Sequence, residues 1–139
     1  MCFLSDIDEC ARNMHNCHTD ATCQNLIGLF NCFCKVGLEG NGTHCKDITE
    51  CSSNIHNCSQ VATCYEMYAS YSCVCHTGYT GDGFSCYDVN ECSEETDNCY
   101  NNATCRNLIG SFNCTCDDGF MGNGTFCDGM HAARTETLL

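Results

Sequence analysis

The segment CQNLIGLFNCFC occupies residues 23–34, and a nearly identical segment, CRNLIGSFNCTC, occupies residues 105–116. In each copy two short runs flank an Ile-Gly pair, and the second run ends in Cys-x-Cys. Cysteines separated by one residue lie on the same face of an extended strand, where they can hold two different partners. The segment therefore predicts two short strands that meet at a turn, Ile27–Gly28 in the first copy.

The complete cysteine pattern occurs three times with a period of 41 residues and no insertion. The repeated cysteines are Cys10, Cys17, Cys23, Cys32, Cys34 and Cys45, then Cys51, Cys58, Cys64, Cys73, Cys75 and Cys86, then Cys92, Cys99, Cys105, Cys114, Cys116 and Cys127. A fixed period of this length indicates structural units in series. We place them at residues 6–46, 47–87 and 88–127 and call them modules 1, 2 and 3.

Composition limits the class of protein and the kinds of partner. The chain has 139 residues, 19 of them cysteine, no proline or tryptophan, and a formal net charge of -13. Such a cysteine content is typical of a disulfide scaffold, and disulfides require an oxidising, extracellular or lumenal compartment. The negative charge argues against nucleic acid and anionic membrane surfaces and favours cations. No apolar run is long enough to span a membrane, so we expect no membrane insertion by this segment.

A second turn is expected late in each module. The signals are Asn41–Gly42, Gly81–Asp82–Gly83 and Gly122–Asn123–Gly124, and Asn-Gly or Asp-Gly pairs favour hairpins. Each module should be a small β structure with little or no helix, in which disulfides replace a core. A bridge that closes a loop of about 15 residues contributes roughly 3 kcal/mol. Six cysteines allow 15 pairings, and the spacing alone does not choose among them.

Several motifs together resemble tandem calcium-binding EGF-like domains of the fibrillin, fibulin and Notch type. The resemblance spans residues 6–127 and rests on the cysteine spacing, the segments DIDEC and DVNEC, the C-x-N-x4-F-x-C-x-C runs, and the endings GLEGNGTHC, GYTGDGFSC and GFMGNGTFC. It implies a small disulfide-rich fold of three EGF-like modules with short antiparallel β-hairpins, arranged as a rod. It also implies that in each module the first cysteine pairs with the third, the second with the fourth and the fifth with the sixth.

Oxygen ligands for Ca²⁺ cluster at the start of two modules. Asp6 and Glu9 precede the first cysteine and Asn25 follows the third, so the bridge that the resemblance implies would draw them together. Ca²⁺ binds six to eight oxygens from carboxylates, amides and backbone carbonyls. The resemblance adds the carbonyls of Ile7, Leu26 and Leu29. The corresponding set in module 3 is Asp88, Val89, Glu91, Asn107, Leu108 and Ser111.

Module 2 departs from this pattern. Its segments are DITEC and CYEMYASYSCVC, so Thr49 replaces an acidic or amide residue and Glu66 stands where the asparagine is expected. We expect a weak or distorted calcium site made from Asp47, Ile48, Glu50 and Glu66. The alternative is that module 2 is a structural spacer and Glu66 a surface residue.

The linkers between modules are very short. Only Lys46 or Tyr87 separates the last cysteine of one module from the aspartate of the next, so a bound cation should stiffen the joint. The resemblance also implies hydrophobic contacts at the joints. Leu38 should meet Tyr68–Ala69, and Tyr79 should meet Ile109–Gly110. We expect the second joint to be better packed and firmer than the first.

The predicted function is that of a calcium-binding, non-enzymatic segment of an extracellular structural or adhesion protein. Its partners would be extracellular proteins, and we expect it to be part of a longer chain. Two alternatives are an EGF-type receptor ligand and the non-catalytic arm of a larger secreted enzyme or receptor. Zinc is disfavoured because no Cys-x2-Cys pair occurs, and catalysis because no Ser, His and Asp set recurs around a pocket.

Modification signals and the chain ends complete the sequence-based predictions. Asn41, Asn102 and Asn123 are N-x-Thr acceptors for glycosylation, and Asn25 and Asn107 match the family's β-hydroxylation pattern. We interpret residues 1–5, which include the odd cysteine Cys2, as a remnant of a preceding module. The alternative for Cys2 is an intermolecular bridge or a thiol. Residues 128–139 are expected to be a flexible tail.

Overall fold

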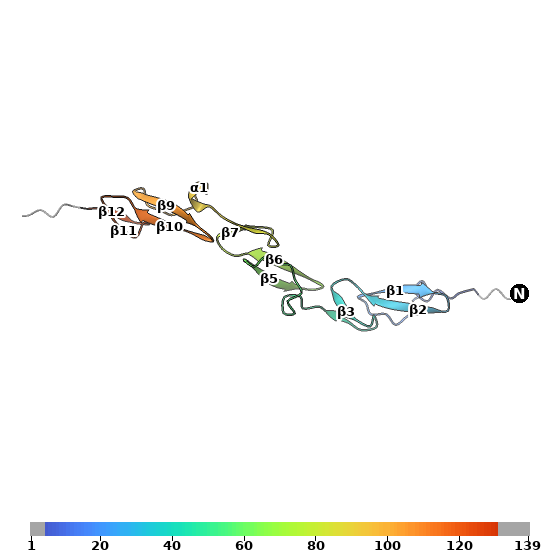
Figure 1. Cartoon of the computed structure of the whole chain (residues 1–139). Helices are drawn as coiled ribbons and strands as arrows, with labels where there is room; N and C mark the ends of the chain where they lie inside the picture. Colours follow the sequence, from blue (N-terminus) through green and yellow to red (C-terminus); the bar gives the residue numbers. More distant parts are fainter. Residues whose placement is uncertain (1–4, 131–139) are drawn as a thin grey trace, which may run out of the picture. The chain divides into compact units, whose positions relative to one another are not determined.

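The computed structural model describes residues 5–130, which form three modules, each with two two-stranded sheets (Figure 1). Module 1 contains β1 (Ala21–Leu26), β2 (Leu29–Cys34), β3 (Leu38–Gly40) and β4 (Cys45–Asp47). Module 2 contains β5 (Ala62–Met67), β6 (Ser70–Cys75), β7 (Tyr79–Gly81) and β8 (Cys86–Asp88). Strands β4 and β8 each extend to the first residue of the next module. Module 3 contains α1 (Glu91–Glu94), β9 (Ala103–Leu108), β10 (Ser111–Cys116), β11 (Phe120–Gly122) and β12 (Cys127–Gly129).

The larger hairpin of each module turns where the sequence predicts. Strands β1 and β2 are antiparallel, and Leu26 opposite Leu29 closes the turn. Gly28 adopts φ +80°, a left-handed conformation that glycine enters without a steric penalty. Gly110 at the equivalent place has φ +78°, but module 2 puts Ala69 there with φ +58°. The turn in module 2 is therefore kept at some backbone cost.

Nine disulfides hold the modules, and their pairing is the one that the resemblance implies. The bridges are Cys10–Cys23, Cys17–Cys32 and Cys34–Cys45 in module 1, Cys51–Cys64, Cys58–Cys73 and Cys75–Cys86 in module 2, and Cys92–Cys105, Cys99–Cys114 and Cys116–Cys127 in module 3. All nine lie within a module. The expectation of a small, disulfide-rich fold with short antiparallel hairpins is confirmed.

Cystine takes the place of a hydrophobic core. Within residues 5–130 the buried hydrophobic residues are Leu38 and three half-cystines, Cys45, Cys73 and Cys127. Two glutamates, Glu50 and Glu91, are as deeply buried as these. Modules this small cannot bury enough apolar surface for stability, so the cross-links supply it.

The described chain divides into two compact units, and each contains one joint between modules. The first unit holds module 1 and most of module 2, up to Cys58 and from Cys64 to Val74. The second unit holds the rest of module 2 and module 3. In the first joint the backbone of Gly37 approaches Ala69, and in the second the backbone of Gly78 approaches Gly110. A Cβ on either Gly37 or Gly78 would lie about 2 Å from a carbonyl oxygen of the next module.

The hydrophobic contacts at the joints are only partly as predicted. The ring of Tyr79 lies against Gly110, but Ile109 is 86% exposed, so tyrosine covers the glycine and not the isoleucine. Leu38 is 8% exposed, whereas Tyr79 is half-buried. Leu38 lies opposite Asp47 in the β3–β4 hairpin, and the expectation that the second joint is better packed than the first stays a prediction.

The end of module 3 lies further along the chain than the sequence indicates. Strand β12 extends to Gly129, which pairs with Phe120, and the Met130 amide donates to the Gly119 carbonyl at 2.8 Å. Residues 128–130, which the sequence assigns to the expected tail, thus pair with residues of the second hairpin. Residues 131–139 and the predicted remnant around Cys2, residues 1–4, lie outside the described residues.

Candidate metal centres

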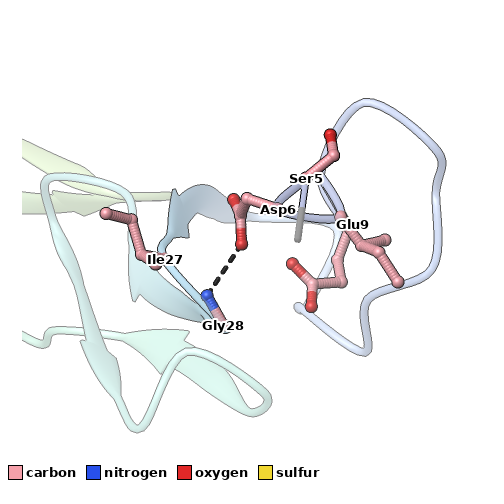
Figure 2. A pocket seen from close by; sticks show the side chains of 6 residues that line it. Ser5, Asp6, Glu9, Ile27 and Gly28 are labelled. Atoms are coloured by element: carbon pink, nitrogen blue, oxygen red, sulfur yellow. Dashed lines mark hydrogen bonds between the residues drawn. The ribbon is translucent and has the colours of Figure 1, made fainter. Parts of the chain in front are cut away.

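We call the segment before the first cysteine of a module, together with the turn of its larger hairpin, the entrance of that module. The entrance of module 1 brings together residues that are far apart in the sequence. Asp6 Oδ1 accepts the Gly28 amide at 2.7 Å, and Asp6 Oδ2 accepts the Asn25 side-chain amide Nδ2 at 2.8 Å. Figure 2 shows the first of these bonds, with the Glu9 carboxylate near Asp6. The hairpin β1–β2 therefore presents its turn to the acidic segment that precedes Cys10.

The entrance of module 3 has the same geometry. Asp88 Oδ1 accepts the Gly110 amide at 2.5 Å, and Asp88 Oδ2 accepts Asn107 Nδ2 at 2.8 Å. Asn107 lies on β9 next to the turn, as Asn25 does on β1. One arrangement of aspartate, asparagine and turn amide thus occurs twice, 82 residues apart in the sequence.

Each of these entrances contains two buried oxygens that have no hydrogen-bond partner among the described residues. They are Glu9 Oε2 and Asn25 Oδ1 in module 1, and Glu91 Oε2 and Asn107 Oδ1 in module 3. Buried polar atoms are nearly always satisfied, so a recurring exception requires a missing partner. The amide nitrogen of each asparagine donates to aspartate, which leaves the amide oxygen as an acceptor. A hard cation bound by oxygen would satisfy both atoms.

Burial of the glutamates strengthens this requirement. Glu50 and Glu91 are only 7% and 8% exposed. A carboxylate is rarely so buried unless it is paired with a positive charge or coordinates a metal. The ion pairs found in the described part of the chain join Lys35 to Asp20 and Lys46 to Glu39, and so include neither Glu50 nor Glu91. A cation would therefore satisfy these two carboxylates.

An open pocket of about 380 Å³ marks the entrance of module 1. It is lined by Ser5, Asp6, Ile7, Glu9, Ile27 and Gly28 (Figure 2). The predicted backbone ligands lie beside the hairpin turns of modules 1 and 3. Leu26 pairs with Leu29 in module 1, and Leu108 pairs with Ser111 in module 3. Ile7 and Val89 lie between the aspartate and the glutamate of their modules.

Hydrogen bonds keep the entrance aspartates ionised. The Gly28 amide, and to a smaller extent the Asn25 side chain, hold the pKa of Asp6 below its ordinary value. The Gly110 amide and then Asn107 lower the pKa of Asp88 in the same way. Both carboxylates therefore carry the charge that a metal ligand needs.

Module 2 brings its predicted ligands together differently. Asp47 Oδ1 accepts the Ala69 amide at 2.6 Å, which matches the other entrances. Glu66 turns to the segment after the first cysteine, where its Oε1 accepts the Ser52 amide at 3.0 Å and lies 3.4 Å from the Ser52 hydroxyl. Of the described oxygens at this entrance, Glu50 Oε2 is the buried one without a partner. Ile48 contributes its amide to the Gly37 carbonyl at 3.1 Å.

One role that the sequence-based prediction missed belongs to the residue before the glutamate in modules 1 and 3. Asp8 Oδ1 accepts the Ala11 amide at 2.9 Å, and Asn90 Oδ1 accepts the Ser93 amide at 3.1 Å as the N-cap of α1. These side chains cap the turn around the first cysteine, which holds the glutamate in place. Their signal was visible, since aspartate, threonine and asparagine at Asp8, Thr49 and Asn90 are common caps.

The predicted glycosylation acceptors lie in two environments. Asn41 and Asn123 are exposed in the second hairpin turn, where each Oδ1 accepts the hydroxyl of the threonine two residues later, at 2.8 and 2.9 Å. Asn102 is half-buried. Three clusters of histidine or aspartate with cysteine, such as His15, Cys17 and Cys23, also occur. Their cysteines form disulfides, which leaves no thiolate for a metal.

Comparison with known proteins places these features in a family. The sequence model of the calcium-binding EGF domain family matches residues 6–45. The sequence model of the EGF domain family matches residues 51–86 and 92–127, and these two ranges cover more than half of the chain. None of the helices in residues 5–130 has the length and apolar character needed to cross a membrane.

Similar proteins match over about one module. The mouse signal peptide, CUB and EGF-like domain-containing protein 3 is 51% identical over 41 residues, 30% of this chain and 4% of that protein. The mouse EGF-containing fibulin-like extracellular matrix protein 1 is 50% identical over 40 residues, 29% of this chain and 8% of that protein. The chain thus matches only a small part of these relatives, and the nine disulfides within residues 5–130 agree with the extracellular setting that the name of the second relative states. The chain belongs to the EGF domain family.

Proposed function

We propose that modules 1 and 3 each bind one Ca²⁺ at the module entrance. The observation that carries the proposal is the pair of buried, unpartnered oxygens, one from glutamate and one from asparagine, at the same repeat position in both modules. Two carboxylates and one amide converge there, and the remaining ligands would be backbone carbonyls: those of Ile7, Leu26 and Leu29 in module 1 and of Val89, Leu108 and Ser111 in module 3. This mixture of hard oxygens suits calcium.

Each side chain has a separate part in this proposal. Asp6 and Asp88 supply negative charge and are oriented by the turn amide that they accept. Glu9 and Glu91 supply a second carboxylate from the capped turn, and the asparagine supplies a neutral oxygen. The match of residues 6–45 to the calcium-binding EGF domain supports this assignment for module 1. Extracellular sites of this kind have dissociation constants of about 10⁻⁴ to 10⁻³ M.

The proposed consequence of binding in module 3 is a stiffer second joint. Asp88 is the last residue of β8, and Val89 donates to the Gly78 carbonyl at 2.9 Å, so the ligand segment is continuous with the end of module 2. A cation that ties this segment to the turn at Gly110 would restrict rotation about the linker. The chain would then act as a non-catalytic structural or interaction segment. The similarity to a fibulin-like extracellular matrix protein supports a matrix or cell-surface setting.

Calorimetric titration of the oxidised chain with Ca²⁺ tests the binding proposal. The native chain should show two comparable binding events, and Asn107→Ala should lose one of them. Asn113→Ala is the matched control, because Asn113 is an exposed asparagine on the same hairpin. An unchanged isotherm for Asn107→Ala would remove the ligand assignment.

Proteolysis at the linker tests the proposed stiffening. Tyr87 is 67% exposed and is the single residue between Cys86 and Asp88. Chymotrypsin should cut after Tyr87 more slowly in millimolar Ca²⁺ than in EGTA, and Asn107→Ala should lose most of this protection. Equal cleavage rates of the native chain with and without calcium would contradict the stiffening.

A further inference from the structure

We propose that a hydrogen bond between Tyr68 and Asp20 pins the first joint without any metal. The Tyr68 hydroxyl donates to Asp20 Oδ2 at 2.7 Å across 48 residues of sequence. Asp20 precedes β1 in module 1, and Tyr68 lies in the turn between β5 and β6 in module 2. Both residues belong to the same compact unit, so the bond crosses the joint between two modules within a single unit.

The repeat shows that this bond is specific to the first joint. The residues 41 positions after Asp20 and Tyr68 are Val61 and Ile109. Neither side chain can make a hydrogen bond, so the second joint has no counterpart of the pin. Ile27 occupies the equivalent turn position in module 1 and is also apolar. Ile27 and Ile109 are 93% and 86% exposed. Tyrosine at residue 68 is therefore the exception at this place in the repeat.

The acceptor is held in position by module 1. Lys35 Nζ lies 3.7 Å from Asp20 Oδ1, and the Lys35 amide donates to the Asp20 carbonyl at 2.9 Å. His18 Nδ1 lies 3.9 Å from Asp20 Oδ2 and accepts the Asp20 amide at 3.1 Å. A carboxylate that is already fixed loses little freedom when it accepts the tyrosine hydroxyl, and a bond to a charged acceptor is stronger than one between neutral groups.

The donor is held in position at the start of module 2. Ala69 follows Tyr68 and donates its amide to Asp47 at 2.6 Å, while its carbonyl packs against Gly37 of module 1. The pin therefore adds a side-chain bond to a close backbone contact. The pin occurs at the first joint, where Glu66 accepts the Ser52 amide and does not reach Asp47 as an asparagine would. The first joint is therefore supported by this hydrogen bond and by the contact between Gly37 and Ala69, without a complete set of calcium ligands.

Lys-C proteolysis in EGTA tests the pin, and the test does not depend on the proposed calcium function. Lys46 is the single residue of the first linker between Cys45 and Asp47, and cutting there separates modules that no disulfide joins. Lys35, the other lysine, lies inside the Cys34–Cys45 loop, so a cut after it releases no fragment on a non-reducing gel. When opening is fast relative to cleavage, the cutting rate follows the population of the open joint.

Tyr68→Phe removes the donor and keeps the ring. In EGTA it should speed the Lys46 cut about threefold to tenfold, the range expected for one hydrogen bond to a partly exposed charge. Tyr87→Phe is the matched control, because Tyr87 is also 67% exposed but lies at the second joint. It should leave the Lys46 cut unchanged. Equal rates for the native chain and Tyr68→Phe would overturn the proposal.

A double-mutant comparison separates the pair from its surroundings. Asp20→Ala should also speed the cut, and by more than Tyr68→Phe if the loss of the Lys35 and His18 contacts loosens module 1. Adding Tyr68→Phe to Asp20→Ala should then give no further acceleration. An additive effect would show that the two residues act separately and would contradict the pin. All variants should first be shown to contain nine disulfides by mass spectrometry.

Discussion

The entrances of modules 2 and 3 differ at several positions, and the presence of Glu66 where module 3 has Asn107 shows what an asparagine does there. In module 3 the Asn107 nitrogen donates to Asp88 and its oxygen remains buried as an acceptor. In module 2 the equivalent Glu66 bonds Ser52. A carboxylate can only accept, so it cannot bridge to Asp47 as the amide does. The Asn107 side chain thus holds Asp88 through its nitrogen and leaves its oxygen free to bind a cation beside Asp88.

Exchanging Asn107 and Glu66 between the two modules should have the largest effect on the calcium affinity of each site. Asn107→Glu should weaken calcium binding at module 3 about a hundredfold, since altering even a supporting partner of a ligand costs about 10–100-fold. Glu66→Asn should strengthen module 2 at least about tenfold, because the new amide can donate to Asp47. Calorimetry of the two variants measures both changes. If Glu66→Asn left the calcium affinity of module 2 unchanged, the missing asparagine would not be the cause of its weak binding.

The close backbone contact at each joint predicts the next largest effect. Gly78→Ala would place Cβ 2.1 Å from the Gly110 carbonyl oxygen at φ +85°. Gly119→Ala at φ +90° meets no described atom within 4 Å, so it is a control for the backbone conformation alone. We expect a cost of about 1–2 kcal/mol for Gly119→Ala and at least about 2 kcal/mol more for Gly78→Ala.

Urea unfolding of the oxidised variants in EGTA measures that difference. Gly37→Ala should behave like Gly78→Ala, because its Cβ would lie 1.9 Å from the Ala69 carbonyl oxygen. Similar free energies of unfolding for all three alanine variants would indicate that the modules do not pack together in solution.

The smallest predicted effect is on the protonation of Asp20. The Tyr68 hydroxyl is the main reason that the pKa of Asp20 is lowered, with Lys35 and His18 contributing less. A lowered pKa in the folded state means that the stabilisation is present above the ordinary value of 3.8 and is lost as the pH falls through the folded pKa.

An NMR titration in EGTA can follow this group directly. The pKa of Asp20 should rise in Tyr68→Phe and stay unchanged in Tyr87→Phe. A pKa of Asp20 that is the same in Tyr68→Phe and the native chain would show that the hydroxyl does not bond the carboxylate in solution.

The sequence predicted the fold well because its strongest signals are covalent and periodic. The 41-residue repeat fixed the number of modules, Ile27–Gly28 marked the main turn, and the family resemblance supplied the disulfide pairing. The ligand set could also be proposed, since Asp6, Glu9 and Asn25 recur at the same offsets. These predictions depend on local spacing, which a single sequence displays.

Other features depend on how side chains rotate and on which modules meet, and spacing does not encode them. The rotation of Glu66 toward Ser52 reflects a backbone amide that is available after the first cysteine. The bond from Tyr68 to Asp20 joins residues that carry no common motif. The order in Asp128 and Gly129 comes from pairing with Met121 and Phe120, although the segment after Cys127 has little pattern.

Residue-resolved NMR in a calcium titration tests the central claim most directly. The amides of Gly28, Ala69 and Gly110 each donate to the entrance aspartate of their own module, so each reports on one site. The Gly28 and Gly110 signals should shift together at low calcium concentration, and the Ala69 signal should shift only at a higher one. If Ala69 shifted at the same concentration as the other two, or if none of the three moved, the account would be contradicted.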